Sequence, residues 1–370
     1  MIKKTDNTIN KTTALGRQWG YKMFKFQKSK ILLATGLLAM AGAANAGYEI
    51  KLSEEDKISF GGYIKVDARY VDGDVGYRDF WLGAGTATAL TESKSQFRLF
   101  ANETRFNMKY THGDVMGFIE MDFWGGGGTE TISNSANPRI RHAFIKYKDV
   151  VVGQTWTTFM NTSAIAETAD FAGPAMGLAF IRQGQVRYTM GNFQVSLENP
   201  FTFGGDGSID DVPDVIARYN LKGDWGNVSF SGLARQLHTT LGNTETGIGY
   251  SVAGRIKTFG KDDLRFQVHG GNVGRYVGVV SGHDVVGEEA EETTAYTASY
   301  RHFWSEGLRS TIAYGHAEAD ISGMESTQWS VNLFKNLTKQ LTVGAEVGNY
   351  ARDDQDVDSN YGQLSLRYVL

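Results

Sequence analysis

The last eight residues of the chain, 363–370, read Gln-Leu-Ser-Leu-Arg-Tyr-Val-Leu, with an apolar side chain at every even-numbered position. Polar side chains occupy three of the four odd-numbered positions. Successive side chains of a β-strand point to opposite faces, so this segment predicts a strand with one apolar and one polar face. Residues 63–70, which read Tyr-Ile-Lys-Val-Asp-Ala-Arg-Tyr, repeat the pattern near the other end of the chain. Both ends of the fold are therefore expected to be amphipathic strands.

The same alternation recurs from end to end of the chain in sixteen segments. Their approximate spans are 58–71, 102–111, 115–124, 138–148, 150–159, 180–190, 193–200, 212–222, 227–238, 246–259, 263–277, 291–304, 308–319, 326–336, 341–352 and 359–370. Tight turns alternate with longer connections, the longest being 72–101, 125–137, 160–179, 201–211 and 278–290. This pattern is typical of an all-β, membrane-spanning antiparallel up-and-down barrel with short periplasmic turns and long external loops.

Three observations favour such a barrel over a soluble β-sandwich or β-solenoid, whose apolar faces would point inward. The first and last segments can pair and so close the sheet. A closed sheet is needed in a bilayer because hydrocarbon cannot form hydrogen bonds with the unpaired backbone groups of an exposed strand edge. Aromatic residues gather near segment ends, where interfacial girdles form. All four prolines lie at strand ends or in loops. A barrel of sixteen strands leaves a water-filled lumen.

The first 46 residues are typical of a secretory signal peptide. A basic start precedes the short apolar run 31–41, and the small-residue site Ala44-Asn45-Ala46 follows it. The run is shorter than the roughly 20 residues that span a bilayer. We therefore expect a signal peptide over 1–46, a short periplasmic segment over 47–57 and the barrel over 58–370.

The charge and composition of the remaining chain exclude several classes of protein. Eight of the 37 Lys and Arg residues and one of the 41 Asp and Glu residues precede residue 47, so the remainder has 29 bases, 40 acids and a net charge of −11. An acidic exported chain is a poor candidate for binding nucleic acid. The absence of Cys excludes a disulfide scaffold. The seven His residues show no ligand spacing, so neither a metal site nor a cofactor is expected.

If the apolar faces meet outer-membrane lipid, the charged side chains on the opposite faces line the lumen. The predicted lumen residues are Arg69, Arg105, Arg187, Arg218, Arg255, Arg265, Arg301, Arg367, Lys65, Glu120 and Asp122, with Lys109 and Lys257 beside them. Arg139 and Arg141 lie near the external mouth, and the sequence leaves open which way they face. The loops, by contrast, are acidic, notably in 206–211, 288–292 and 353–358. The wall is therefore expected to be mixed in charge and locally basic.

A guanidinium group stays charged and can hold a carboxylate through two parallel hydrogen bonds, and rings of Arg favour anions. The arginines therefore predict passive diffusion of small anionic solutes, such as dicarboxylates, without a catalytic step. Two alternatives stay open. If the arginines pair with neighbouring acids, the barrel is a general porin, and a barrel enzyme such as a lipase or protease would need a Ser/His pair that the sequence does not reveal.

The connection 160–179 lies between the fifth and sixth predicted strands, where many sixteen-stranded porins carry a constricting loop. Its residues are small and weakly charged, which suits a loop packed inside a barrel. We expect the stretch from Asn161 to Phe180 to fold into the lumen and narrow it.

Four short motifs connect the sequence with a known family. They are Val152-Gly153-Gln154-Thr155-Trp156-Thr157-Thr158-Phe159-Met160, Phe171-Ala172-Gly173-Pro174, Arg182-Gln183-Gly184-Gln185-Val186-Arg187-Tyr188-Thr189 and Val195-Ser196-Leu197-Glu198-Asn199-Pro200. In these motifs the chain resembles the DcaP-like outer membrane porins, most strongly over 115–200. The resemblance implies a homotrimer of sixteen-stranded barrels in the outer membrane of a Gram-negative bacterium, associated with uptake of dicarboxylates and related small anions.

Overall fold

The computed structural model describes residues 47–370 except 77–88, 132, 172 and 279–280, so the predicted signal peptide lies outside the described residues. Its strands are β1 (Tyr48–Lys51), β2 (Asp56–Val75), β3 (Ala89–Phe100), β4 (Arg105–His112), β5 (Val115–Asp122), β6 (Arg139–Tyr147), β7 (Val150–Trp156), β8 (Arg182–Met190), β9 (Phe193–Glu198), β10 (Asp214–Gly223), β11 (Gly226–His238), β12 (Thr244–Lys257), β13 (Asp263–Gly271), β14 (Val285–Val286), β15 (Glu289–Ala290), β16 (Thr293–Phe303), β17 (Leu308–Ala319), β18 (Glu325–Asn336), β19 (Leu341–Arg352) and β20 (Val357–Val369). Four 3-10 turns are also present, η1 (Thr162–Ala164), η2 (Ala175–Gly177), η3 (Gly207–Ile209) and η4 (Asp353–Gln355). Among these residues no helix has the length and apolarity needed to cross a bilayer.

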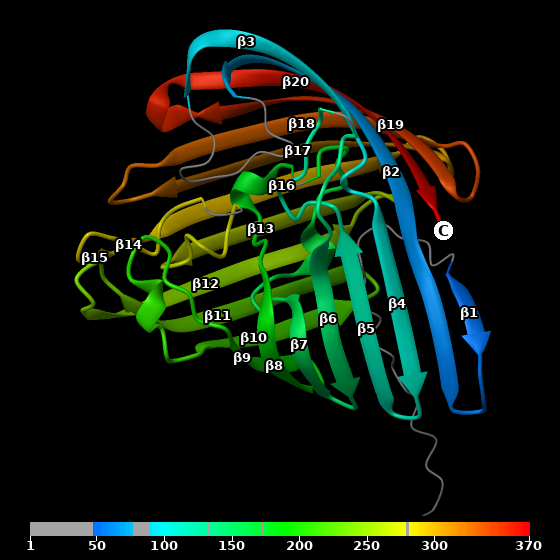
Figure 1. Ribbon diagram of the computed structural model, residues 1–370, viewed down its shortest axis with the longest axis horizontal. Coiled ribbons are helices and arrows are strands. Elements are labelled where there is room, and N and C mark those ends of the chain that lie inside the picture. Colours follow the sequence, from blue (N-terminus) through cyan, green and yellow to red (C-terminus); the bar gives the residue numbers. More distant parts are fainter. Residues whose placement is uncertain (1–46, 77–88, 132, 172, 279–280) are drawn as a thin grey trace, which may run out of the picture. The chain divides into compact units, whose positions relative to one another are not determined.

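The wall is a closed antiparallel barrel in which each strand pairs with its neighbour along the chain and β2 pairs with β20 (Figure 1). Both β3 and β4 pair with β2, along its second and first halves, so together they occupy one position in the wall. The short β1 pairs only with residues 57–60 of β2, and the separate β14–β15 hairpin lies outside the wall sheet. The described wall therefore has sixteen strand positions, as the alternation predicts.

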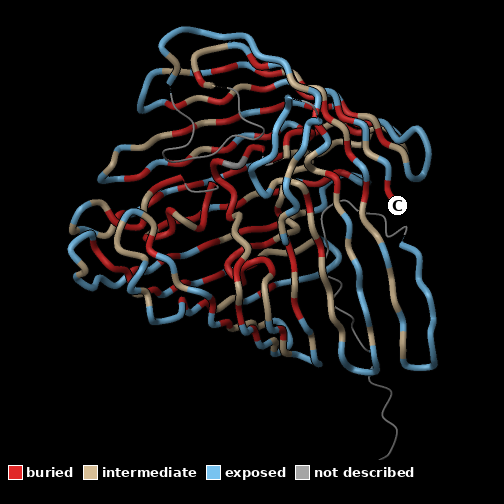
Figure 2. Tube along the Cα trace, in the orientation of Figure 1, coloured by how far each residue is buried: buried red, intermediate tan, exposed pale blue. Residues whose placement is uncertain are grey.

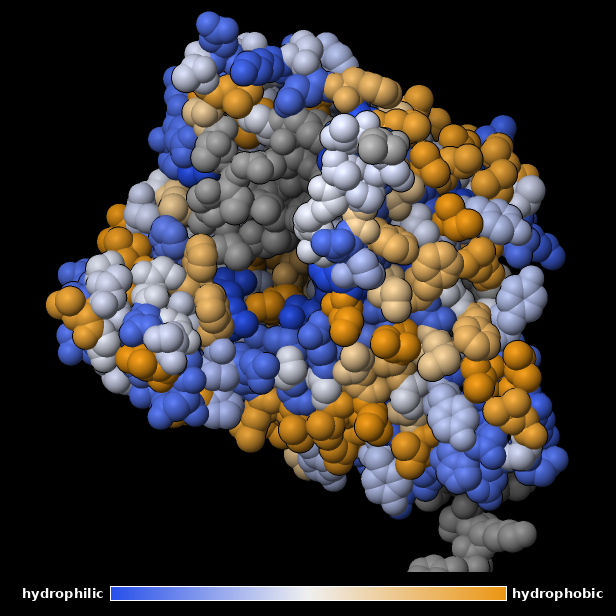
Figure 3. Space-filling view, viewed as in Figure 1, coloured by the Kyte–Doolittle hydropathy of each residue, from blue (hydrophilic) through white to orange (hydrophobic). Residues whose placement is uncertain are grey.

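The two faces of the wall carry the polarity expected of a membrane barrel. On β2 and β20, Ile64 and Leu366 are 44% and 46% exposed, whereas the adjacent Lys65 and Ser365 are 5% and 4% exposed. Figure 2 shows this alternation of buried and exposed residues along the strands, and Figure 3 shows hydrophobic side chains gathered over the wall with hydrophilic ones at its ends. Apolar side chains therefore face outward, and polar side chains face the interior.

Two predicted boundaries are wrong. Residues 89–100, assigned to the connection 72–101, form β3 and continue the wall strand predicted over 102–111. The strand predicted over 263–277 ends at Gly271, which has a φ of +93°. An added Cβ at Gly271 would lie 2.2 Å from the carbonyl oxygen of Ile248, so only glycine allows the chain to leave the ladder there.

Two connections pack against inward-facing residues of the wall. The inner segment, which is residues 157–171 and 173–181 between β7 and β8, hydrogen-bonds to the second inner segment, which is residues 272–278 and 281–284 after β13. The amide of Phe180 donates to the Tyr276 carbonyl at 3.0 Å, and that of Gly278 donates to the Leu178 carbonyl at 2.8 Å. Side chains of both segments form one buried apolar cluster with inward-facing residues of β10, β11, β16 and β17. The barrel interior therefore contains a packed apolar core on one side.

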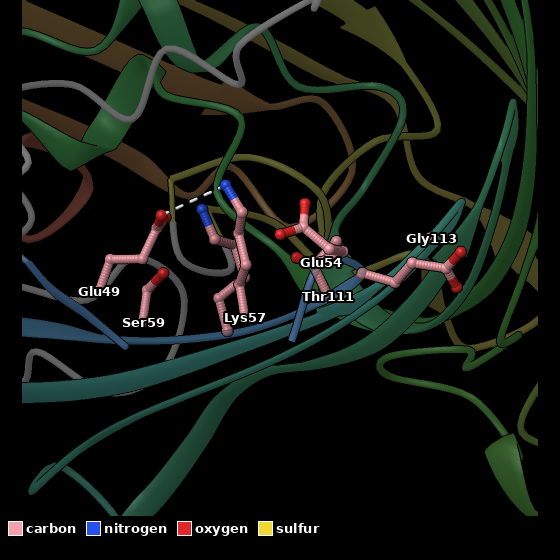
Figure 4. Close-up of a pocket in the computed structure, with 8 residues that line it drawn as sticks. Glu49, Glu54, Lys57, Ser59, Thr111 and Gly113 are labelled. Atoms are coloured by element: carbon pink, nitrogen blue, oxygen red, sulfur yellow. Dashed lines mark ion pairs between the residues drawn. The ribbon is translucent and has the colours of Figure 1, made fainter. Parts of the chain in front are cut away.

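The end of the barrel that carries β1 has a small polar hollow (Figure 4). Residues of β1, β2 and β4 and of the adjacent turns line it, and the Lys57 ammonium lies 3.3 Å from the Glu49 carboxylate. Both side chains of this pair are about half exposed, and exposed ion pairs contribute roughly 0–1 kcal/mol. The hollow carries mixed charge, and its one ion pair adds little to stability.

Candidate permeation path

The inner segment is held against the β16–β17 side of the wall by one carboxylate. Glu167 lies 2.9 Å from the Arg301 guanidinium and 2.6 Å from that of Arg309. Burial alone would raise the pKa of Glu167, but the hydrogen bond and charge of Arg309, together with those of Arg301, outweigh burial and lower this pKa to about 2. Glu167 is therefore ionised at neutral pH and clamps the segment to two strands.

A second attachment lies three residues further along the segment. Asp170 pairs with Arg69 at 2.6 Å, and both side chains are fully buried. The amides of Ala169 and Asp170 donate to the Glu346 carboxylate at 2.8 and 3.0 Å. The Lys65 ammonium donates to the Ala169 carbonyl at 2.8 Å and also pairs with Glu103. These contacts attach the segment to β2 and β19.

Three predicted lumen arginines share one acid. Asp263 lies 2.9 Å from Arg255, 2.6 Å from Arg265 and 2.6 Å from Arg301. Arg265 also donates to the carbonyl of Ile165 in the inner segment. The positive charge predicted at these positions is present, but nearby carboxylates partly neutralise it.

The opposite side of the interior has a different arrangement, in which guanidinium groups surround aromatic rings. The guanidinium carbons of Arg105, Arg139 and Arg141 lie 5.7, 5.8 and 5.9 Å from the ring centroid of Phe171 in the inner segment. No two of these guanidinium carbons can therefore lie more than 11.7 Å apart, the sum of the two longest distances. Arg182 lies 4.4 Å above the ring of Trp156. We call these four arginines the basic cluster.

Two carboxylates face the four guanidinium groups of the basic cluster. Glu120 lies 2.9 Å from Arg141, and Asp122 lies 2.8 Å from Arg139 and 3.0 Å from Arg141. No carboxylate of the described chain lies within 4.0 Å of Arg182, and the nearest to Arg105 is Glu103 at 3.8 Å, which Lys65 already binds. The cluster therefore has excess positive charge. Arg139 and Arg141, whose orientation the sequence left open, both belong to it.

The remaining predicted arginines contact carbonyls or rings. Arg187 donates to the Trp156 carbonyl at 3.4 Å, Arg218 donates to the Thr158 carbonyl at 3.3 Å and also to that of Met160, and Arg367 lies 5.7 Å from the Tyr63 ring. Within the described chain none of the three has a carboxylate within 4.0 Å. Arg218 thus binds the first residues of the inner segment, and Arg187 binds the last residue of β7 just before it. Lys109 and Lys257 are exposed on β4 and β12.

Sequence reasoning missed several interior residues. Arg235, Arg309 and Arg182 face inward on β11, β17 and β8, and strict counting of alternate positions would have found the first two. Arg235 forms a buried network with Asp284 at 2.5 Å and Asp214 at 3.2 Å. Asp284 belongs to the second inner segment, part of which was assigned to a strand, so no sequence signal indicated this contact.

Two acidic residues of the 288–292 run accept hydrogen bonds from neighbouring connections. Glu288 accepts hydrogen bonds from the hydroxyls of Thr239 and Thr240 at 2.6 and 2.8 Å, and these bonds, with that of Asn243, lower its pKa. Glu291 is buried and accepts from the amides of His283 and Ser322. The run 288–292 therefore ties external connections together.

Comparison with known proteins confirms the resemblance. Residues 38–197 match the model of the DcaP outer membrane protein family. The outer membrane channel DcaP of Acinetobacter baumannii has a similar structure, with a TM-score of 0.72 and 24% identity over 87% of this chain and 99% of that chain. No curated protein sequence matches the chain.

Two more distant structures have the same fold. The anion-selective porin from Comamonas acidovorans has a TM-score of 0.56 and 13% identity over 85% of this chain and all of that chain. The trimer form of OmpT from Vibrio cholerae has a TM-score of 0.56 and 14% identity over 86% of this chain and all of that chain. The barrel and the family match identify an integral outer-membrane protein of the porin type, and they favour a channel over an enzyme.

Proposed function

We propose that this outer-membrane porin favours small anions, and dicarboxylates in particular, as they pass the basic cluster. The excess of guanidinium groups over carboxylates at Phe171 and Trp156 is the observation that carries the proposal. Walls of low dielectric focus the field of such a cluster on the solute path. Because the guanidinium carbons around Phe171 are separated by at most 11.7 Å, one small solute can meet two of these groups.

The proposal includes a constricting role for the inner segment. Glu167 and Asp170 fix it to the wall on one side, and Phe171 brings it beside the basic cluster on the other. A solute passing the cluster is then confined near guanidinium groups rather than diluted in a wide lumen. Confinement strengthens their interaction with the solute because it excludes water.

A general porin with little preference is the second candidate, and the ion pairs of Arg255, Arg265, Arg301 and Arg309 support it. Reversal potentials of the purified protein in planar bilayers, under a gradient of potassium chloride and then of potassium succinate, separate the two. We expect anion preference in both salts. A ratio near one or a preference for potassium would overturn the proposal in favour of the general porin.

We also propose that the functional unit is a homotrimer. The resemblance to the DcaP-like porins implies this state, and the trimer form of OmpT shows a barrel of this fold in that state. Native mass spectrometry of the detergent-solubilised protein tests the oligomer directly. A mass of three chains is expected, and a monomer that conducts with unchanged selectivity would show that assembly is not required.

A further inference from the structure

Three potential metal ligands lie together on the outward face of the wall, away from the lumen. His316 and Glu318 belong to β17 and Glu325 begins β18. On β17 these residues share the face of Ile312, which is 59% exposed, whereas the intervening Ala313 is 1% exposed. The two strands meet at the 320–324 connection, so the group lies at their external end.

The strand register brings the three ligand atoms together. Glu318 lies directly opposite Glu325, and His316 lies opposite Thr327. One ligand atom from each of His316, Glu318 and Glu325 can be chosen so that all lie within 4.8 Å of one another. The Nε2 atom of His316 is 3.9 Å from a carboxylate oxygen of each glutamate. Two carboxylates and one imidazole nitrogen thus converge on a single point.

Hydrogen bonding behind the imidazole determines which nitrogen carries the proton. The Thr327 hydroxyl donates its single proton to Asp353 at 2.6 Å, so it can only accept from His316 Nδ1 at 3.4 Å. A neutral imidazole held in this way carries its proton on Nδ1 and directs the Nε2 lone pair at the two carboxylates. Metal-bound histidines usually donate the N–H of their other ring nitrogen to a hydrogen-bond acceptor, and the Thr327 hydroxyl, itself bonded to Asp353, is that acceptor here.

Glu318 and Glu325 have no Lys or Arg partner in the described part of the chain. Like charges directly opposite on neighbouring strands destabilise a sheet. No Lys or Arg of the described chain lies within 4.0 Å of either glutamate. The carboxylates are 59% and 44% exposed, so an ion can reach them from solvent. A cation between them would remove the repulsion and join β17 to β18.

We propose that His316, Glu318 and Glu325 bind a divalent transition-metal ion, of which Zn²⁺ is the best fit. Imidazole nitrogen with carboxylate oxygen suits Zn²⁺, whereas Ca²⁺ and Mg²⁺ prefer oxygen ligands only. Spacing along the sequence does not reveal this site because one ligand lies across a strand pair from the other two. The site is independent of the permeation path, since it faces outward.

Zinc titration of the full-length protein in detergent, stripped first with a chelator, tests the proposal by isothermal calorimetry. We expect one Zn²⁺ per chain and little heat from CaCl₂ at the same concentration. His316→Gln and Glu325→Gln should each weaken zinc binding at least about tenfold, the range found for lost ligand support. Retained heat modifiability on gels would show that each variant is folded.

His112→Gln is the matched control. His112 also has two carboxylates beside it, but Asp56 lies 2.7 Å from Nδ1 and Glu55 lies 3.8 Å from Nε2. Because they are at opposite nitrogens of the ring, the three residues do not form a convergent group like that at His316. The control should bind zinc as the parent protein does. Absence of stoichiometric binding, binding unaffected by His316→Gln, or equal loss in His112→Gln would each overturn the proposal.

Discussion

Arginines on the two sides of the barrel interior have different partners. On the β13–β17 side, Arg301 and Arg309 share Glu167 of the inner segment, and Arg301 also contacts Asp263. On the β4–β8 side, Arg182 stacks on Trp156, and the basic cluster has more guanidinium groups than carboxylates. Arginine thus holds the inner segment in place on the β13–β17 side. On the β4–β8 side it supplies positive charge that carboxylates do not fully neutralise.

The largest effect is expected from removing the uncompensated charge. In the double variant Arg105→Gln/Arg182→Gln, which removes the two arginines of the cluster without a close carboxylate of their own, the chloride-to-potassium permeability ratio should fall by roughly tenfold, because fields focused in a low-dielectric cleft alter local ion concentration by about that factor or more. Reversal potentials in planar bilayers measure the ratio. Arg98→Gln, at an exposed pair with Glu130, is the control and should leave the ratio unchanged. An unchanged ratio in the double variant would show that the cluster does not select.

Removing the clamp should change pore size more than selectivity. Glu167→Gln leaves Arg301 and Arg309 without their shared carboxylate, which should weaken docking of the inner segment by about 3 kcal/mol, the low end for breaking a buried pair. We expect larger conductance with frequent steps and a permeability ratio within about twofold of the parent. Single-channel recording measures both quantities. A steady current of parental size would mean that other contacts suffice to hold the segment.

The lowered pKa of Glu167 allows docking of the inner segment to be tested by changing the pH instead of the residue. Because this pKa is lowered to about 2 from 4.5, its stabilisation of docking is complete above pH 4.5 and is lost as the pH falls towards 2. Single-channel records should therefore be quiet between pH 7 and 5 and should show steps only in more acidic buffer. Glu167→Gln should show steps throughout this range. Steps that begin in the parent near pH 6 would point to another titrating group.

The sequence predicted the barrel well because alternation is a local property. The outward Leu366 and the inward Ser365 follow from a period of two, and membrane hydrocarbon enforces the same pattern on every strand. The end of β13 was predicted wrongly because the local pattern continues there without a partner strand. Residues 272–277 alternate like β13, but they leave the ladder after Gly271 and pack inside the barrel.

The partners of the interior charges could not be predicted, since they depend on which strands face each other across the lumen. Arg69 and Asp170 are separated by 101 residues, and Arg309 and Glu167 by 142. The alternation of polar and apolar residues predicted which arginines lie on the inner face. The motifs shared with the DcaP-like porins include Arg182. Neither the alternation nor the motifs indicate that Asp263 pairs with three arginines, or that Arg182 stacks on Trp156 without a carboxylate partner in the described chain.

The smallest effect is expected from Arg255→Gln, on the compensated side. Arg255 is 34% exposed and shares Asp263 with Arg265 and Arg301, so this carboxylate keeps two cations after the substitution. The loss of stability should stay below about 1 kcal/mol, as for other half-exposed pairs. The permeability ratio should change far less than in the double variant, because a locally paired charge adds little field at a distance. A large fall in the permeability ratio would mean that paired arginines also attract the solute. The distinction between the β13–β17 side, which holds the inner segment, and the β4–β8 side, which selects anions, would then be wrong.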